Sequence, residues 1–125
     1  MIALTLSSQV MAYGQDDSPP FDSIVCKAGN TSVLVQIKHY RQTYGAGPAF
    51  IKANGASWMG GWDWQAADEG TRLTGYYHLN IKANGQNGIG AIYLHTLYNP
   101  LYGNLSGGWL EMKGASGSVN CEIQY

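Results

Sequence analysis

Three histidines, His39, His78 and His95, are the side chains that could bind a metal ion. A hairpin centred on Gln86 and Asn87 pairs residues whose numbers sum to 173, which places His78 directly opposite His95 on neighbouring strands. Zinc needs three or four ligands that converge on one point, and two cross-strand imidazoles supply only part of that set. We therefore expect a pair of half-exposed strand histidines, with no metal site and no other cofactor.

Carboxylates could perform acid–base chemistry, but only where two of them share a cleft. The acidic residues after Pro20 are scattered along the chain: Asp22, Asp63, Asp68, Glu69, Glu111 and Glu122. Among them Asp63 has distinctive neighbours, because it lies between two tryptophans, where it could bind a sugar hydroxyl. No nucleophile motif and no glycine loop that opens a helix accompanies these residues. The sequence therefore predicts no catalytic residues, and we expect a protein that is not an enzyme.

Aromatic residues are concentrated in one short segment. Trp58, Trp62 and Trp64 fall within seven residues and share one face of a strand, while Gly60 and Gly61 interrupt them. Three indoles would overfill the interior of a small barrel, so we expect some to be exposed and a bulge or turn at the two glycines to tilt the strand outward. The alternative is that the indoles are ordinary core residues. The predicted ligand-binding residues are Trp58, Trp62, Asp63, Trp64, Tyr76 and Tyr77.

The two cysteines, Cys26 and Cys121, lie near the two ends of the β-rich region. Alternation places each of them on the apolar face of its strand, so we expect a disulfide that joins the first strand to the last. Closing so long a loop is worth about 4 to 5 kcal/mol in chain-entropy models. Such a bond predicts an oxidising compartment, and hence a secreted, periplasmic or extracellular protein. The alternative is two unrelated buried thiols.

The elements that must position these side chains are strands. Apolar residues follow a period of two, and Gly, Asn and Asp punctuate the runs every 8 to 14 residues or so. The expected strands cover residues 23–28, 32–40, 49–53, 57–65, 72–83, 89–98, 105–113 and 118–125. This pattern predicts an all-β fold, a small antiparallel barrel of about eight strands. A two-sheet β-sandwich would satisfy the same alternation.

The chain divides into three parts. Residues 1–14 have two interpretations, a signal-peptide remnant or an N-terminal strand that pairs with a neighbour, since Ile2, Leu4 and Leu6 alternate with smaller residues. Residues 15–22 form an irregular lead-in, and residues 23–125 form a single β domain. No apolar stretch reaches the 18 or so residues of a membrane-spanning helix, so we expect no membrane span.

Composition limits the partners. The 125 residues include 7 Lys and Arg and 8 Asp and Glu, and this near-neutral balance argues against nucleic acid as a ligand. We expect a secreted or periplasmic non-enzymatic recognition module that binds a glycan, a small apolar ligand or a protein partner. The alternative is a structural subunit of an extracellular filament or assembly, which would self-associate through residues 1–14 as an intersubunit β-strand.

Overall fold

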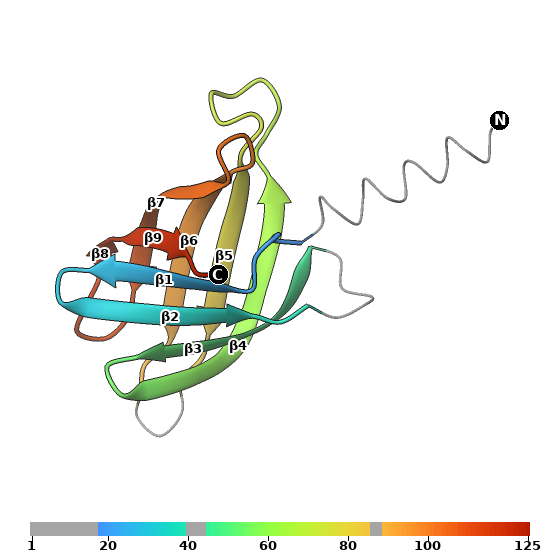
Figure 1. Cartoon of the computed structure of the whole chain (residues 1–125). Coiled ribbons are helices and arrows are strands. Elements are labelled where there is room, and N and C mark those ends of the chain that lie inside the picture. Colours follow the sequence, from blue (N-terminus) through green and yellow to red (C-terminus); the bar gives the residue numbers. More distant parts are fainter. Residues whose placement is uncertain (1–17, 40–44, 86–88) are drawn as a thin grey trace.

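The structure, a computed structural model, describes residues 18–39, 45–85 and 89–125. These residues form an all-β fold of nine antiparallel strands that curl into a nearly closed barrel (Figure 1). The predicted barrel is therefore confirmed, and the sandwich alternative is not adopted. The strands are β1 (Ser23–Ala28), β2 (Thr31–Ile37), β3 (Ala46–Ala53), β4 (Ala56–Ala66), β5 (Tyr77–Ala83), β6 (Ile92–Asn99), β7 (Asn104–Glu111), β8 (Gly117–Ser118) and β9 (Asn120–Ile123).

The barrel is a meander whose last segment contacts both ends of the sheet. Each strand from β1 to β8 pairs with its neighbour in sequence, and β9 pairs with β1. Only Val119 separates β8 from β9, and its N–H donates to the carbonyl of Gly108 on β7 at 3.2 Å. The predicted strand 118–125 is thus split, its start paired with β7 and the rest with β1. No ladder of the described residues joins β7 to β9, which leaves one unsealed seam.

The period of two that predicted the strands also builds the core. On β6 the residues alternate between the interior, where Leu94 and Thr96 are fully buried, and the partly exposed outer face. One predicted strand is wrong in part, because residues 72–76 form a turn before β5 and do not extend that strand. Gly70 and Gly75 adopt positive φ there, and the hydroxyl of Thr74 donates to the carbonyl of Asp68 at 3.1 Å. These local bonds compete with a ladder and favour the turn.

The tryptophans of β4 lie inside the barrel. Trp58, Trp62 and Trp64 are only 4%, 2% and 5% exposed, so the expected exposure of this segment is wrong. The expected bulge at Gly60 and Gly61 is absent too, because the register of β4 runs without interruption against β3 and β5.

Small residues make the room that the volume argument had denied. A Cβ atom on Gly47 would lie 2.8 Å from the ring of Trp62, so this glycine gives the indole its space. The indole N–H groups of Trp58 and Trp62 donate to the carbonyls of Gly90 and Lys38, at 2.9 and 3.0 Å. Four indoles do not have to compete for the interior, because glycine replaces a larger side chain beside one of them.

An aromatic cluster fills one end of the barrel. Trp64 stacks on Tyr77 with ring centroids 4.9 Å apart, and Tyr98 and Phe21 pack against the same indole. Phe21 belongs to the predicted irregular lead-in, so the described part of that segment is anchored in the core. Burial raises the pKa of Tyr98, and the neighbouring Tyr125 raises it further. Within the described ranges no helix is long and apolar enough to cross a membrane.

Candidate functional site

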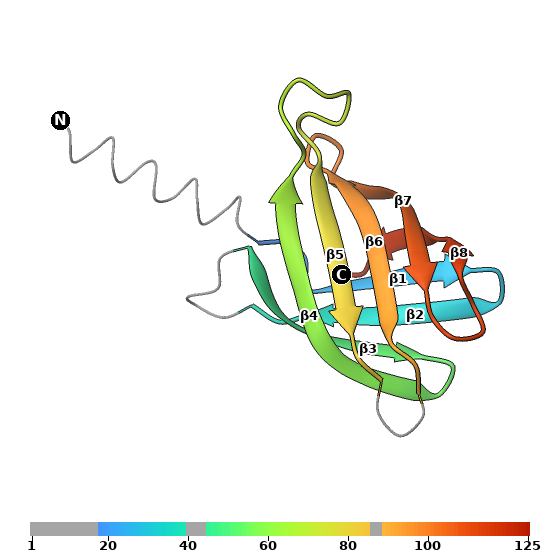
Figure 2. The same cartoon turned by 180° about the vertical axis from the view of Figure 1, so that it is seen from behind.

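The outer faces of β4, β5, β6 and β7 lie side by side (Figure 2). The register aligns one residue from each strand in a row across this surface: Asp63, Asn80, His95 and Trp109. A carboxylate, an amide, an imidazole and an indole are therefore presented together on the outside of the barrel. We call these four residues the outer row.

Hydrogen bonds fix the first half of the outer row. The side-chain amide of Asn80 donates to Oδ1 of Asp63 at 3.0 Å, and it accepts a bond from the hydroxyl of Tyr93 at 3.0 Å. Each of these polar groups thus has a partner that sets its direction. Asp63 is the one predicted ligand-binding residue that lies in the outer row.

The two histidines meet beside this network, though not in the predicted register. Asn80 lies opposite His95, and His78 lies opposite Leu97, so the histidines are diagonal neighbours and the predicted direct pairing is off by two residues. Nδ1 of His78 and Nε2 of His95 are nevertheless 3.0 Å apart, and one ring donates to the other. Burial lowers the pKa of His95, His78 lowers it further, and the carboxylate of Asp63 opposes both effects.

The third histidine does not join them. Nε2 of His39 lies 3.1 Å from the carbonyl of Phe21 and 3.3 Å from the exposed carboxylate of Asp22. In the ranges that the structure describes, no group of three or more His, Cys, Asp or Glu side chains could hold a metal ion. The histidine pair with its neighbours is therefore a hydrogen-bonded surface feature of the described barrel.

A β-bulge places Trp109 on the outer surface. The β6–β7 register shifts between His95 and Leu97, so that Gly107 and Gly108 together face Thr96. Gly107 has φ 64°, and the hydroxyl of Thr96 donates to its carbonyl at 2.7 Å. The extra residue reverses the side on which the following residues point. Trp109 is consequently 45% exposed.

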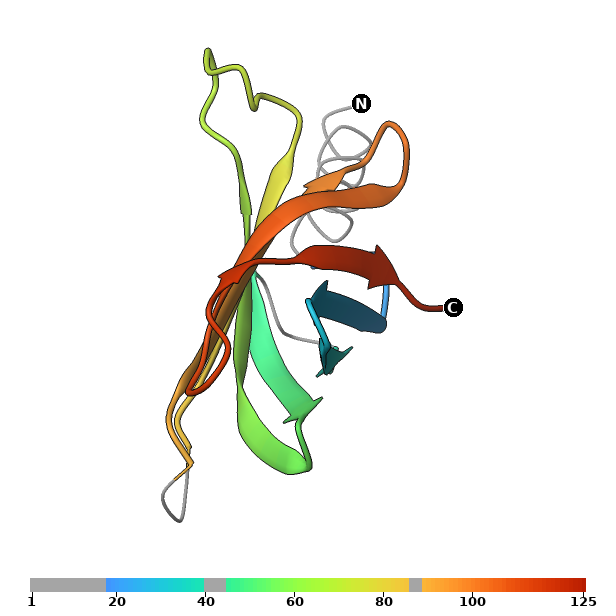
Figure 3. The same cartoon turned by 90° about the vertical axis from the view of Figure 1, so that its left-hand side faces the viewer.

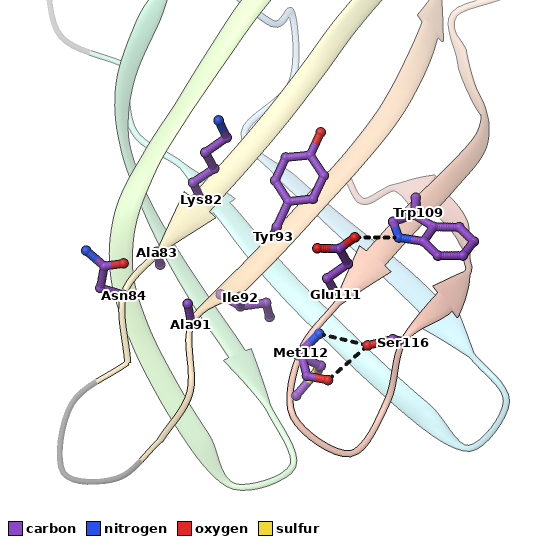
Figure 4. Close-up of a pocket in the computed structure, with 10 residues that line it drawn as sticks. All are labelled: Lys82, Ala83, Asn84, Ala91, Ile92, Tyr93, Trp109, Glu111, Met112 and Ser116. Atoms are coloured by element: carbon purple, nitrogen blue, oxygen red, sulfur yellow. Dashed lines mark hydrogen bonds between the residues drawn. The ribbon is translucent and has the colours of Figure 1, made fainter.

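Trp109 borders an open depression of about 770 Å³ over β5, β6 and β7 (Figure 4). Its indole N–H donates to Oε1 of Glu111 at 3.1 Å, and the ammonium of Lys82 lies 5.7 Å from the ring centre of Tyr93. The register aligns Lys82, Tyr93 and Glu111 in a second row, parallel to the outer row. The depression is lined by Lys82, Ala83, Asn84, Ala91, Ile92, Tyr93, Trp109, Glu111, Met112 and Ser116.

The residues predicted from sequence do not form one surface. Trp58, Trp62 and Trp64 lie in the interior and Tyr77 stacks on Trp64, while Tyr76 lies in the turn before β5, where it accepts a bond from Asn99 at 3.4 Å. A ligand-binding role for these aromatic residues stays a prediction. The residues that line the depression were missed, and the signal that could have found them is the Gly-Gly pair just before Trp109.

The disulfide bears on the surroundings in which this surface works. Cys26 and Cys121 are bonded to each other, as predicted, and no free cysteine occurs in the part of the chain that is described. A disulfide is typical of proteins outside the reducing cytosol. The bond therefore points to an oxidising, extracytoplasmic environment.

The depression combines two exposed aromatic faces with a carboxylate, an ammonium and an amide. Such a surface can stack against the apolar face of a ring and hydrogen-bond the polar groups at its edge. No protein-family model, no curated protein and no solved structure matches this chain.

Proposed function

We propose that the protein is a non-enzymatic, extracytoplasmic recognition module that binds a glycan in the depression beside Trp109. The observation that carries the proposal is the half-exposed indole of Trp109, held in place by its hydrogen bond to Glu111. Folded proteins rarely leave a large aromatic side chain on a polar surface without a use for it. Sugar rings present C–H groups that stack on an indole face, with a gain of about 1 kcal/mol beyond simple burial.

The polar lining supports a hydroxyl-rich ligand. Glu111 accepts hydrogen bonds, Lys82 donates them, and the side-chain amide of Asn84 does both. One carboxylate and one ammonium leave the lining without net charge. We therefore expect a neutral glycan to bind better than a strongly anionic one.

The other candidate ligands fit less well. A small apolar ligand would need an enclosed apolar cavity, and the smaller space beside Trp58 and Met112 has a volume of about 240 Å³, below the roughly 300 Å³ at which ligand sites usually begin. Glycoside hydrolysis ordinarily needs two carboxyl groups about the scissile bond. Glu111 is the one acidic residue that lines the depression, which supports a binding role without catalysis.

A glycan array with the disulfide-bonded protein tests the proposal, followed by calorimetric titration of the best neutral glycan. Trp109→Ala should weaken binding by about tenfold or more, the scale of a lost aromatic anchor. Tyr102→Ala is the matched control, because Tyr102 is an exposed aromatic residue in the turn before β7, outside the depression. Equal affinity of Trp109→Ala and the wild type, or an array without any bound glycan, would overturn the proposal.

A further inference from the structure

The seam between β7 and β9 is a second surface that is open to a partner. Beyond the bond from Val119 to Gly108 the two strands separate (Figure 3), and a groove of about 650 Å³ opens between them. The groove is lined by Gly103, Asn104, Leu105, Gly107, Asn120, Cys121, Glu122, Ile123 and Tyr125. It lies on the far side of β7 from the β5–β6 strands that carry most of the depression.

The backbone of β9 presents hydrogen-bonding groups to this groove. Gln124 N–H donates to the carbonyl of Ser23 at 2.9 Å, which orients alternate residues of β9 toward β1. In an antiparallel ladder the residues between them point their N–H and C=O groups the other way. Cys121 and Ile123 therefore direct their backbone groups into the groove, where the described part of β7 forms no ladder with them. Such an edge is a template for one more strand.

The side chains of the groove define what that strand must look like. Leu105 and Ile123 pack against the core on the inner side, while Asn104, Asn120 and Glu122 are exposed on the outer side. A strand that fills the seam would continue both surfaces. It must therefore alternate apolar residues, facing inward, with small or polar residues facing solvent.

We propose that residues 2–7 of the same chain occupy this seam and complete the barrel. In this segment Ile2, Leu4 and Leu6 alternate with Ala3, Thr5 and Ser7, and it carries no charged side chain. Six residues in this pattern match the inner and outer demands of the groove.

The position at which the described chain begins supports an intramolecular strand. Phe21 packs against Tyr98, which lies opposite Leu105 at the open end of the seam, and Ser23 lies beside Gln124. Residues 8–17 could span roughly 33 Å when extended, which is enough to turn back along a small barrel. A short tether also gives an effective concentration of roughly millimolar, which favours the chain's own segment over a second copy.

Amide hydrogen exchange in the full chain, followed by NMR, tests this strand. The amides of Cys121 and Ile123 should exchange about tenfold or more slowly in the wild type than in Leu4→Asp, because the variant places a charge on the inward face of the proposed strand. Thr5→Asp is the matched control and should exchange like the wild type, since Thr5 faces outward. The amides of Val33 and Val35 on β2 should be the same in all three proteins, which verifies that the barrel is folded.

Three results would overturn the proposal. The first is equal exchange of Cys121 and Ile123 in the wild type and Leu4→Asp. The second is protection that rises with protein concentration together with oligomers in light scattering, because a second copy would then be the occupant. The third is a native protein whose intact mass shows that residues 1–14 have been removed. None of these measurements depends on glycan binding.

Discussion

Cys26 and Cys121 lie directly opposite each other on β1 and β9, with their Cα atoms 3.9 Å apart, and their disulfide joins positions 95 residues apart in sequence. The bond restrains the chain where the first strand meets the last. Cys26→Ser should reduce the free energy of unfolding by about 4 kcal/mol, because the unfolded chain regains the entropy of a long open loop. Thermal unfolding followed by circular dichroism should show a midpoint lower by at least several degrees. Cys121→Ser should match it, and a midpoint unchanged in both variants would contradict this role.

Gly60 is predicted to be irreplaceable, whereas its neighbour Gly61 is not. A Cβ atom on Gly60 would collide with the carbonyl oxygen of Lys82 and with Ala83 on β5, and the backbone there cannot easily move. Gly60→Ala should therefore reduce the free energy of unfolding by about 1 to 3 kcal/mol. A Cβ atom on Gly61 would lie 3.3 Å from the carbonyl of Gly47, so Gly61→Ala should cost clearly less. Urea unfolding of the two variants measures the difference, and equal losses would refute the prediction.

His95 should make stability depend on pH. Because burial lowers its pKa in the folded state, the unfolded chain takes up the proton first as the pH falls. The contribution of His95 is complete above the unfolded pKa of about 6.5 and declines as the pH drops toward the lower folded pKa. The free energy of unfolding of His95→Gln should fall less steeply than that of the wild type over this window. The denaturant midpoint, measured between about pH 7.5 and pH 5, checks this, and parallel curves would exclude the effect.

Thr96 is expected to hold the bulge that turns Trp109 outward. Its side chain is 1% exposed, and its hydroxyl is the hydrogen-bond partner of the Gly107 carbonyl. Thr96→Val keeps the shape but leaves that carbonyl without this donor, so the free energy of unfolding should fall by about 1 to 3 kcal/mol. Thr31→Val, at the partly exposed start of β2, is the control and should change stability little. Acrylamide quenching of tryptophan fluorescence should also change in Thr96→Val if the indole of Trp109 moves, and a variant as stable as the control would argue against this role.

The sequence allowed the fold to be predicted because local alternation carries it. The strand expected at residues 23–28 coincides with β1, and the shared inward face of Ile24 and Cys26 was readable from a period of two. The break at Val119 was not predictable in this way, since Val119 and Cys121 keep the same alternation on both sides of it. Which neighbour each half pairs with depends on strands far away in the sequence.

The candidate site was harder to predict for two physical reasons. Burial of an indole depends on the space that other strands leave, and Gly47, eleven residues before Trp58, supplies some of it on β3. The side on which Trp109 points depends on one extra residue in β7, and a regular alternation from the buried side of Leu105 would have placed it inside. Asp63 was found from its local neighbours, but the partners that orient it come from β5 and β6.

The meander has a consequence for how the chain folds. Seven ladders of the described strands join neighbours in sequence, and the β1–β9 ladder alone brings distant segments together. Each hairpin can therefore form at a small loop-closure cost, while the final meeting of β1 and β9 carries the long-range contact order that slows folding. If the two ends were joined by a short linker and the chain opened at the tight turn of Asn54 and Gly55, the β1–β9 pairing would become local. The β3–β4 pairing would take its place as the slow, late event.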